Sequence, residues 1–111
     1  MGLLVNVNGK TDKSSYSIGE AITITGQVKG VLGMRGVGNV TVNLIRNGIV
    51  AKQAVSDPSG DFTFQDTSNP WTSQGETEES LKQNGITYAV EAWRFMVGHD
   101  VTQLPTVEIT G

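Results

Sequence analysis

The chain has 111 residues, a net charge of −3 and no cysteine. This length predicts one domain, residues 1–111, and the absence of Cys excludes disulfides and thiolate zinc sites, so an apolar core must hold the fold. The acidic balance argues against a nucleic-acid partner, and no run reaches the ~18 apolar residues of a membrane-spanning helix, so we expect no membrane insertion.

Two strands are expected in the first thirty residues. Alternating apolar residues predict a first strand over residues 3–7 that ends at Asn8-Gly9. After a turn at Gly19, a second strand runs from Ala21 to about Gly30. Its core-facing residues are Ile22, Ile24 and Val28, and polar residues alternate with them.

A hairpin is expected in the next segment. Residues 30–38 are glycine-rich and predict a surface loop that exposes Val31, Leu32 and Met34. The third strand follows, with Val40, Val42 and Leu44 facing the core. Asn47-Gly48 predicts a type I′ turn, because both central positions of that turn need a positive φ. The expected pairs are Leu44 with Ala51, Val42 with Gln53 and Val40 with Val55, with the second strand at a sheet edge.

Residues 57–85 predict a turn, a strand and a helix. Asp57-Pro58-Ser59-Gly60 has the residue order of a type I turn, and the strand at 61–65 directs Phe62 and Phe64 inward. Residues 66–85 then form a long excursion from the sheets. Its second half predicts a short helix with Thr77 as N-cap and Gly85 just after its end.

Two strands complete the chain. Residues 87–95 place Tyr88, Val90 and Ala92 inward and Trp93 outward, and residues 106–110 form the last strand after a polar turn that contains His99. About seven short antiparallel strands with hairpin and type I turns predict an all-β, immunoglobulin-like sandwich with one excursion at 66–85.

Two motifs carry a family resemblance. The first is T-D-K-x-x-Y-x-x-G-E at residues 11–20, directly before the alternating strand, and the second is D-x-x-G-x-F at residues 57–62. The sequence therefore resembles the immunoglobulin-like domains of bacterial and archaeal surface and secreted proteins. The resemblance implies an extracellular or cell-surface location.

Trp71, Trp93 and Phe95 are the candidate residues for contact with a partner or a glycan. Trp93 and Phe95 share the outward face of their strand, and Trp71 follows Pro70 in the excursion. Exposed aromatic side chains can anchor a protein or stack on a sugar ring. The competing interpretation, which we favour at this stage, is that the excursion folds back over Trp93 and makes a satellite core.

The sequence favours a non-catalytic protein without cofactor or metal. The one histidine, His99, has no serine in a nucleophile elbow to activate. Asp57, Asp61 and Asp66 offer oxygen atoms to calcium, but the calcium-loop pattern is absent and the turn already explains Asp57.

We therefore expect an extracellular spacer or adhesion and interaction module, monomeric as an isolated domain, whose partners are neighbouring domains, a protein or a glycan. The alternative is a carbohydrate-binding module of a secreted hydrolase that uses Trp71 and Trp93. A third interpretation is a filament or tail subunit that associates through sheet edges. Fold alone does not choose among them.

Overall fold

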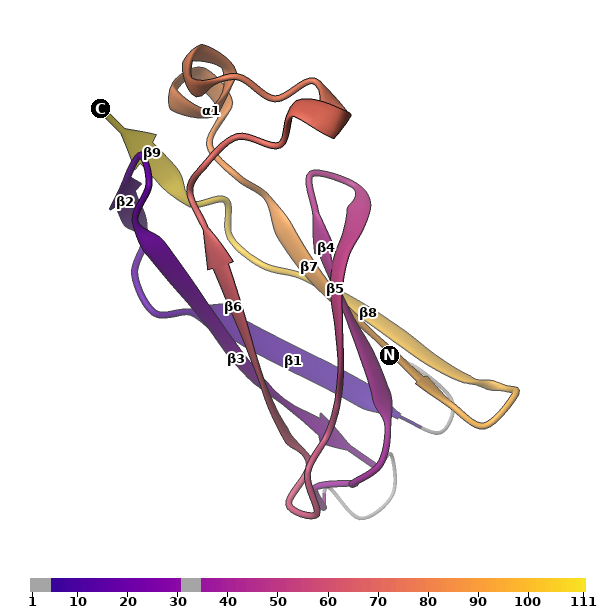
Figure 1. Ribbon diagram of the computed structural model, residues 1–111. Helices are drawn as coiled ribbons and strands as arrows, with labels where there is room; N and C mark the ends of the chain where they lie inside the picture. The colour runs from indigo at the N-terminus through magenta and orange to yellow at the C-terminus, as the bar shows by residue number, and fades with distance from the viewer. Residues whose placement is uncertain (1–4, 31–34) are drawn as a thin grey trace.

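The computed structural model describes residues 5–30 and 35–111, which form an elongated β-sandwich (Figure 1). The strands in chain order are β1 (Asn6–Thr11), β2 (Ser15–Ser17), β3 (Ala21–Lys29), β4 (Thr41–Arg46), β5 (Ile49–Val55), β6 (Asp61–Thr67), β7 (Tyr88–Arg94), β8 (Gly98–Gln103) and β9 (Glu108–Thr110). A 3₁₀ turn, η1 (Thr72–Gln74), and a helix, α1 (Glu78–Asn84), lie between β6 and β7. The predicted all-β, immunoglobulin-like sandwich is confirmed.

Two antiparallel sheets enclose the core. One has the order β1-β3-β6 and the other has the order β5-β4-β7-β8, while β2 and β9 form a separate parallel pair. The inward residues of β3, β4 and β7 are almost fully buried, as their alternation predicts. α1 packs against β9 at one end of the sandwich and contributes the buried Leu81. Within residues 5–30 and 35–111, no helix combines the length and the apolar character needed to cross a membrane.

Most predicted turns and caps are confirmed. Phe62 and Phe64 are buried after the 57–60 turn, in which the Gly60 N–H donates to the Asp57 carbonyl at 2.8 Å. Thr77 caps α1, because its side chain accepts the Ser80 N–H at 3.0 Å, and Gly85 follows the helix with φ of 70°.

The pairing of β4 with β5 follows the predicted two-residue turn only for the two residue pairs next to that turn. Asn47 and Gly48 have the expected positive φ, and Ile45 pairs with Val50. A β-bulge between Leu44 and Ile45 then shifts the pairing by one residue, so that Leu44 lies opposite Lys52. The three predicted pairs of this hairpin are therefore wrong, because a bulge sets two residues of one strand against one of the other. β5 is an edge strand, as predicted.

Four strand assignments also need correction. The first strand does not end at Asn8-Gly9 but continues to Thr11, because pairing with β3 overrides the turn preference of that dipeptide. His99 lies in strand β8, not in a turn, and pairs with Trp93. The short β2 was not predicted, and the last strand is limited to β9. Leu3, Val31, Leu32 and Met34, for which exposure or strand structure was predicted, lie outside the described residues.

The resemblance motif at residues 11–20 forms a local polar network. Asp12 Oδ1 accepts hydrogen bonds from the Tyr16 hydroxyl at 2.5 Å and from the Thr23 N–H at 3.1 Å. Glu20 Oε1 accepts the Ser17 N–H at 2.9 Å, and Gly19 has the positive φ that the turn requires. The hydrogen bond from Tyr16 lowers the pKa of Asp12. The motif therefore builds the turn before β3.

Side chains from the four-stranded sheet satisfy both edges of the three-stranded sheet. On β1, the Val7 N–H donates to Asp100 Oδ2 at 2.8 Å, and the Thr102 hydroxyl donates to the Val7 carbonyl at 2.6 Å. On β6, the Lys52 ammonium donates to the Gln65 carbonyl. Such occupied edges offer fewer free backbone groups to another strand.

The approach of Gly26 to its neighbours gives the first prediction. A Cβ at this position would lie 2.1 Å from the Asn8 carbonyl oxygen and 2.3 Å from the Phe62 ring. We expect Gly26→Ala to lower the free energy of unfolding by about 1–3 kcal/mol, because the backbone of β1 and the Phe62 ring would have to move to admit the methyl group. Gly30→Ala, whose Cβ would meet Val37 at 3.5 Å, is the control. Equal denaturation midpoints for both variants would contradict the close packing at Gly26.

Candidate functional site

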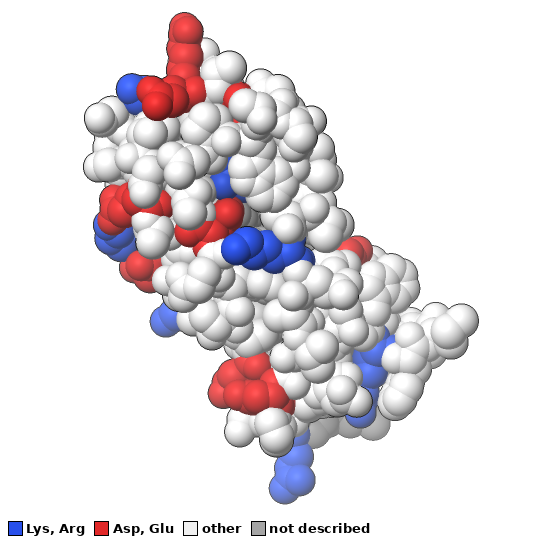
Figure 2. All heavy atoms as spheres, viewed as in Figure 1, with Lys and Arg blue, Asp and Glu red and all other residues white. Residues whose placement is uncertain are grey.

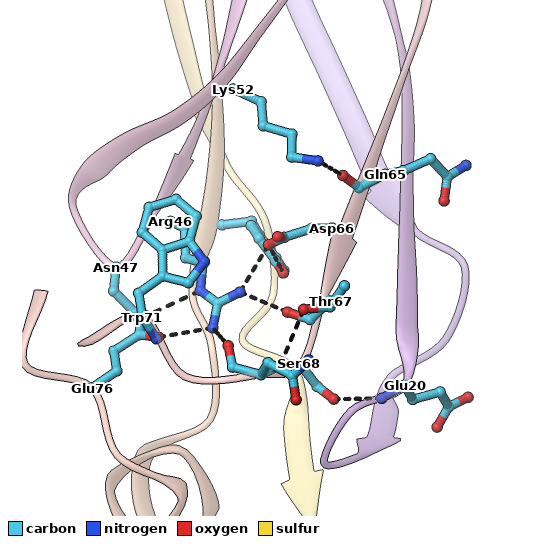
Figure 3. A network of polar contacts seen from close by, with 12 residues as sticks. Glu20, Arg46, Asn47, Lys52, Gln65, Asp66, Thr67, Ser68, Trp71 and Glu76 are labelled. Atoms are coloured by element: carbon cyan, nitrogen blue, oxygen red, sulfur yellow. Dashed lines mark hydrogen bonds and ion pairs between the residues drawn. The ribbon is translucent and has the colours of Figure 1, made fainter. Parts of the chain in front are cut away.

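Arg46 lies fully buried at the end of β4 and binds the chain that leaves β6 (Figure 3). Its guanidinium lies 3.0 Å from Asp66 Oδ2 and 2.8 Å from Glu76 Oε1. It also donates to the carbonyl oxygens of Thr67 and Asn69, each at 2.6 Å. These bonds satisfy the buried charge and fix the start of the excursion beside β4.

The ionisation of this cluster follows from its contacts. Burial alone would raise the pKa of Glu76, but hydrogen bonds from Arg46, Asn47 and the Trp71 N–H outweigh it and hold the pKa below its ordinary value. Burial, together with the hydrogen bond to Asp66, raises the pKa of the Tyr88 hydroxyl above its ordinary value. The cluster is therefore a charged and hydrogen-bonded support of the fold.

Trp71 belongs to this cluster and not to a surface shared with Trp93. Its ring centroid lies 5.1 Å from the Arg46 guanidinium carbon, a cation–π geometry, and its side chain is half-buried. Arg46 pairs with Tyr88, whereas Trp93 pairs with Thr41 at the other end of the β4–β7 ladder. The expectation that the excursion covers Trp93 is therefore wrong: Arg46 holds the excursion at the opposite end.

The outer face of the four-stranded sheet carries a polar row. Gln53 donates to Asn43 Oδ1 at 3.0 Å, and Asn43 donates to Glu91 Oε1 at 3.0 Å. His99 Nε2 lies 2.8 Å from the other carboxylate oxygen of Glu91. The hydrogen bonds from Asn43 and His99 lower the pKa of Glu91. The row therefore satisfies its own polar groups across four strands.

An aromatic pair borders the polar row. The Trp93 and His99 rings stack with centroids 3.9 Å apart, and Trp93 remains 45% exposed. One face of the indole is thus covered by His99. Exposed Val55 and Val101 lie on the same outer face, since Val55 and Trp93 both pair with Thr41 and Val101 pairs with Glu91.

The hairpin that joins β7 and β8 ends in three exposed apolar residues, which we call the apolar tip: Phe95, Met96 and Val97, which are 75%, 92% and 63% exposed. Figure 1 places this hairpin at the lower right, and Figure 2 shows a protruding uncharged surface there with basic atoms beside it. Arg94 lies with its guanidinium carbon 5.1 Å from the Phe95 ring centroid. The tip is the most exposed apolar feature of the described residues.

A groove adjoins the tip. It has a volume of about 440 Å³ and runs between the 37–41 segment and the tip-side residues Trp93, Arg94 and Phe95. The structure thus brings Trp93 and Phe95, two of the three predicted contact residues, to one groove. Exposed apolar surface of this kind marks interaction sites on soluble proteins.

The three aspartates considered for calcium do not meet. Asp57 accepts the Ser59 and Asp61 N–H groups through one carboxylate oxygen, each at 2.9 Å. Asp66 lies at the other end of β6 and binds Arg46. Across residues 5–30 and 35–111, no group of three or more His, Asp or Glu side chains is placed to hold a metal ion.

Sequence reasoning missed Met96, Val97 and Arg46. Phe95 to Val97 is an apolar run between two strands with none of the usual turn residues, and that composition was a usable signal. Arg46 continues the inward alternation of Val42 and Leu44, which predicts a buried cation in need of partners.

The fold defines the chain as a small immunoglobulin-like β-sandwich module. The sequence matches no protein-family model and no curated protein. Among solved structures, the CARDB domain of a Pyrococcus furiosus protein, determined in complex with di-metal ions, is similar over 97% of this chain and 90% of that chain. The sequences are 15% identical and the TM-score is 0.50. This similarity supports the fold.

Parts of a Listeria innocua β-glucosidase, in complexes with glucose and with isofagomine, are also similar. The identity is 17% and the TM-score is 0.41, and the match covers 96% of this chain but only 16% of the glucosidase.

Arg46 gives the second prediction. Arg46→Met leaves two buried carboxylates without their cation, so we expect the free energy of unfolding to fall by about 3–5 kcal/mol. Chemical denaturation followed by circular dichroism measures the change. Lys10→Met, which replaces an exposed cation on β1, is the control and should change it by no more than about 0.5 kcal/mol. A similar loss in both variants would contradict the role of the cluster.

Glu76 gives the third prediction. Its pKa is lowered in the folded state, so its contribution to stability is present above its unfolded pKa and is lost as the pH falls through the folded pKa. We expect the gap in melting temperature between the wild type and Glu76→Gln to be largest at neutral pH and to narrow below about pH 4.5. A gap that stays constant down to about pH 3 would contradict this assignment.

Proposed function

We propose that the chain is a non-catalytic immunoglobulin-like module of an extracellular or cell-surface protein and acts as a spacer or an adhesion and interaction domain. The observation that carries the proposal is the apolar tip beside the groove that Trp93 and Phe95 line. Apolar residues at this exposure cost solubility and do nothing for the core, which favours a role in contact with another surface.

The shape of the module suits a spacer. The described residues span 44 × 23 × 19 Å, and the long axis separates the start of β1 from the end of β9 (Figure 1). β1 begins beside the hairpin end, and β9 finishes beside α1. Domains joined at both ends would therefore continue along the long axis, and the apolar tip would face the preceding domain or its surroundings.

The surroundings of His99 support a non-catalytic role. The ring stacks on Trp93 and contacts the Glu91 carboxylate, and Glu91 is held in turn by Asn43. A hydroxyl nucleophile would need to lie within hydrogen-bond reach of the ring to be activated. The contacts of His99 instead fix an aromatic pair on a sheet face.

A carbohydrate-binding module remains the second candidate because of Trp93. The indole is 45% exposed and borders a row of amide and carboxylate groups, which is a combination suited to a sugar ring and its hydroxyls. Trp71 does not contribute to this surface. Calorimetric titration with soluble oligosaccharides, compared between the wild type and Trp93→Ala, separates this candidate from the first.

The apolar tip gives the fourth prediction. On intact cells that carry the full protein, a membrane-impermeant amine reagent should label exposed lysines such as Lys10 and Lys13. Met96→Lys should leave the melting temperature unchanged, since Met96 is 92% exposed, and should abolish attachment of the cells to their natural surface. Val50→Lys, at an exposed position of β5, is the matched control. Absence of labelling would contradict the extracellular location, and attachment unaffected by Met96→Lys would contradict the interaction role and leave the spacer role.

A further inference from the structure

The apolar tip projects from the sandwich and departs from the usual chemistry of a turn. Phe95 has a φ of 58°, in the left-handed region that a bulky side chain rarely adopts, and Met96 and Val97 follow it directly. Gly or Asn would occupy this position at a lower cost. Such departures from local preference concentrate at functional sites, so the tip is better explained by what it contacts than by the fold.

A convex tip of three residues suits a fluid surface better than a rigid one. A stable protein–protein interface takes about 20–30 residues from each partner and requires a matching shape. The tip offers three strongly exposed apolar side chains on a protrusion (Figure 2). A lipid bilayer closes around a protruding apolar group without a preformed complement, and the free energy gained grows with the apolar area removed from water.

Three basic residues gather at the base of the tip: Lys29, Arg35 and Arg94. A Cβ on Gly30 would lie 3.8 Å from Arg94 Nη1, so the chain that leaves β3 lies beside the Arg94 guanidinium. The Gly30 N–H donates to the Arg35 carbonyl at 2.9 Å, and Lys29 pairs with Gly36. The backbones of Lys29 and Arg35 are therefore close to Arg94, on a chain whose net charge is −3.

The carboxylates of this end do not cancel these cations at the tip. Asp57 accepts two backbone N–H groups, and Asp100 is buried and accepts the Val7 N–H. Figure 2 shows acidic atoms at this end on the side away from the protruding surface, whereas basic atoms lie directly beside that surface. Anionic headgroups around the tip would therefore meet cations, and each such cation strengthens binding to an anionic membrane.

We infer that the apolar tip inserts into the surface of a lipid bilayer that contains anionic headgroups, while the three basic residues lie at the level of the phosphates. The inference rests on the proposed function, because it names the partner of the same surface. It replaces the expectation of no membrane insertion, which concerned spanning helices. A tip that enters only the outer ~5–10 Å of one leaflet keeps its backbone within the hydrated headgroup region.

Trp93 lies where such binding can be followed. It is 45% exposed, it lines the same groove as Phe95, and His99 covers one face of its ring. Indole rings favour the headgroup level of a membrane. The other tryptophan, Trp71, packs over Arg46 at the opposite end. Insertion of the tip should therefore change the environment of Trp93 and leave that of Trp71 unchanged.

Co-sedimentation with vesicles tests the inference, with vesicles of phosphatidylcholine alone and of phosphatidylcholine mixed with phosphatidylglycerol. We expect the wild type to bind the mixed vesicles with a blue shift of its tryptophan emission, and Trp93→Phe to lose that shift. Met96→Gln should weaken binding by about fivefold or more, because a polar amide replaces the thioether. Val50→Gln, at an exposed position of β5, is the matched control and should leave binding unchanged. A wild type that does not bind the mixed vesicles would overturn the inference.

A second set of variants tests the basic residues. Arg35→Gln should weaken binding to the mixed vesicles by about fivefold, whereas Lys10→Gln, which removes an exposed cation from β1, should not. Added salt should weaken binding of the wild type, because it screens the cations. Equal binding to both kinds of vesicle would overturn the preference for anionic headgroups.

The two proposals can fail separately. If the wild type ignores the mixed vesicles but Met96→Lys still abolishes cell attachment, the lipid partner is overturned and the interaction module stands. If the vesicles bind as expected but intact cells are not labelled, insertion of the tip stands and the extracellular location is overturned.

Discussion

The buried guanidinium of Arg46 is the constraint on which the rest of the structure depends. It sits where the core would otherwise be apolar, and its partners come from the end of β6 and from Glu76 just before α1. A buried cation has to be satisfied, so this requirement fixes the path of the chain between the two sheets. Because Trp71 then packs over Arg46, the excursion stays at the α1 end. The opposite end of the four-stranded sheet, with Trp93, is left uncovered.

Much of the fold could be predicted because local and tertiary preferences agree. A few residues were enough to predict three features correctly: the alternation in β3, the 57–60 turn and the Thr77 cap. In each of them burial reinforces what the backbone already favours. Prediction failed where tertiary pairing decides. Asn8-Gly9 has the composition of a turn but lies within β1, and the bulge that shifts β4 against β5 has no signature in sequence spacing. β8 was missed because its polar residues serve other strands: Asp100 and Thr102 satisfy the backbone of β1.

The candidate site could be predicted only in part, for a related reason. Outward alternation in β7 correctly exposes Trp93. Phe95 was predicted within the same strand, but it is exposed in the turn that follows β7. The separation of Trp71 from Trp93 could not be predicted from the sequence, because it depends on where Arg46 holds the excursion. Nor does alternation predict the groove, whose far wall is contributed by a segment more than fifty residues upstream of Trp93. Sites assembled from loops on different strands are fixed by topology, which a periodic pattern does not contain.

Under the proposed function, the two ends of the module divide stability and interaction between them. At the α1 end, charged and polar groups are buried with their partners, so removal of one partner would leave the other buried and unpaired. At the hairpin end, Phe95 adopts an unfavourable φ, and its neighbours expose apolar side chains that contribute little to the core. A sequence under selection for stability alone would place Asn or Gly at such a turn. The cost is tolerable because the cluster at the other end does not depend on the tip, so the sandwich keeps its fold while the tip serves the interaction proposed for it.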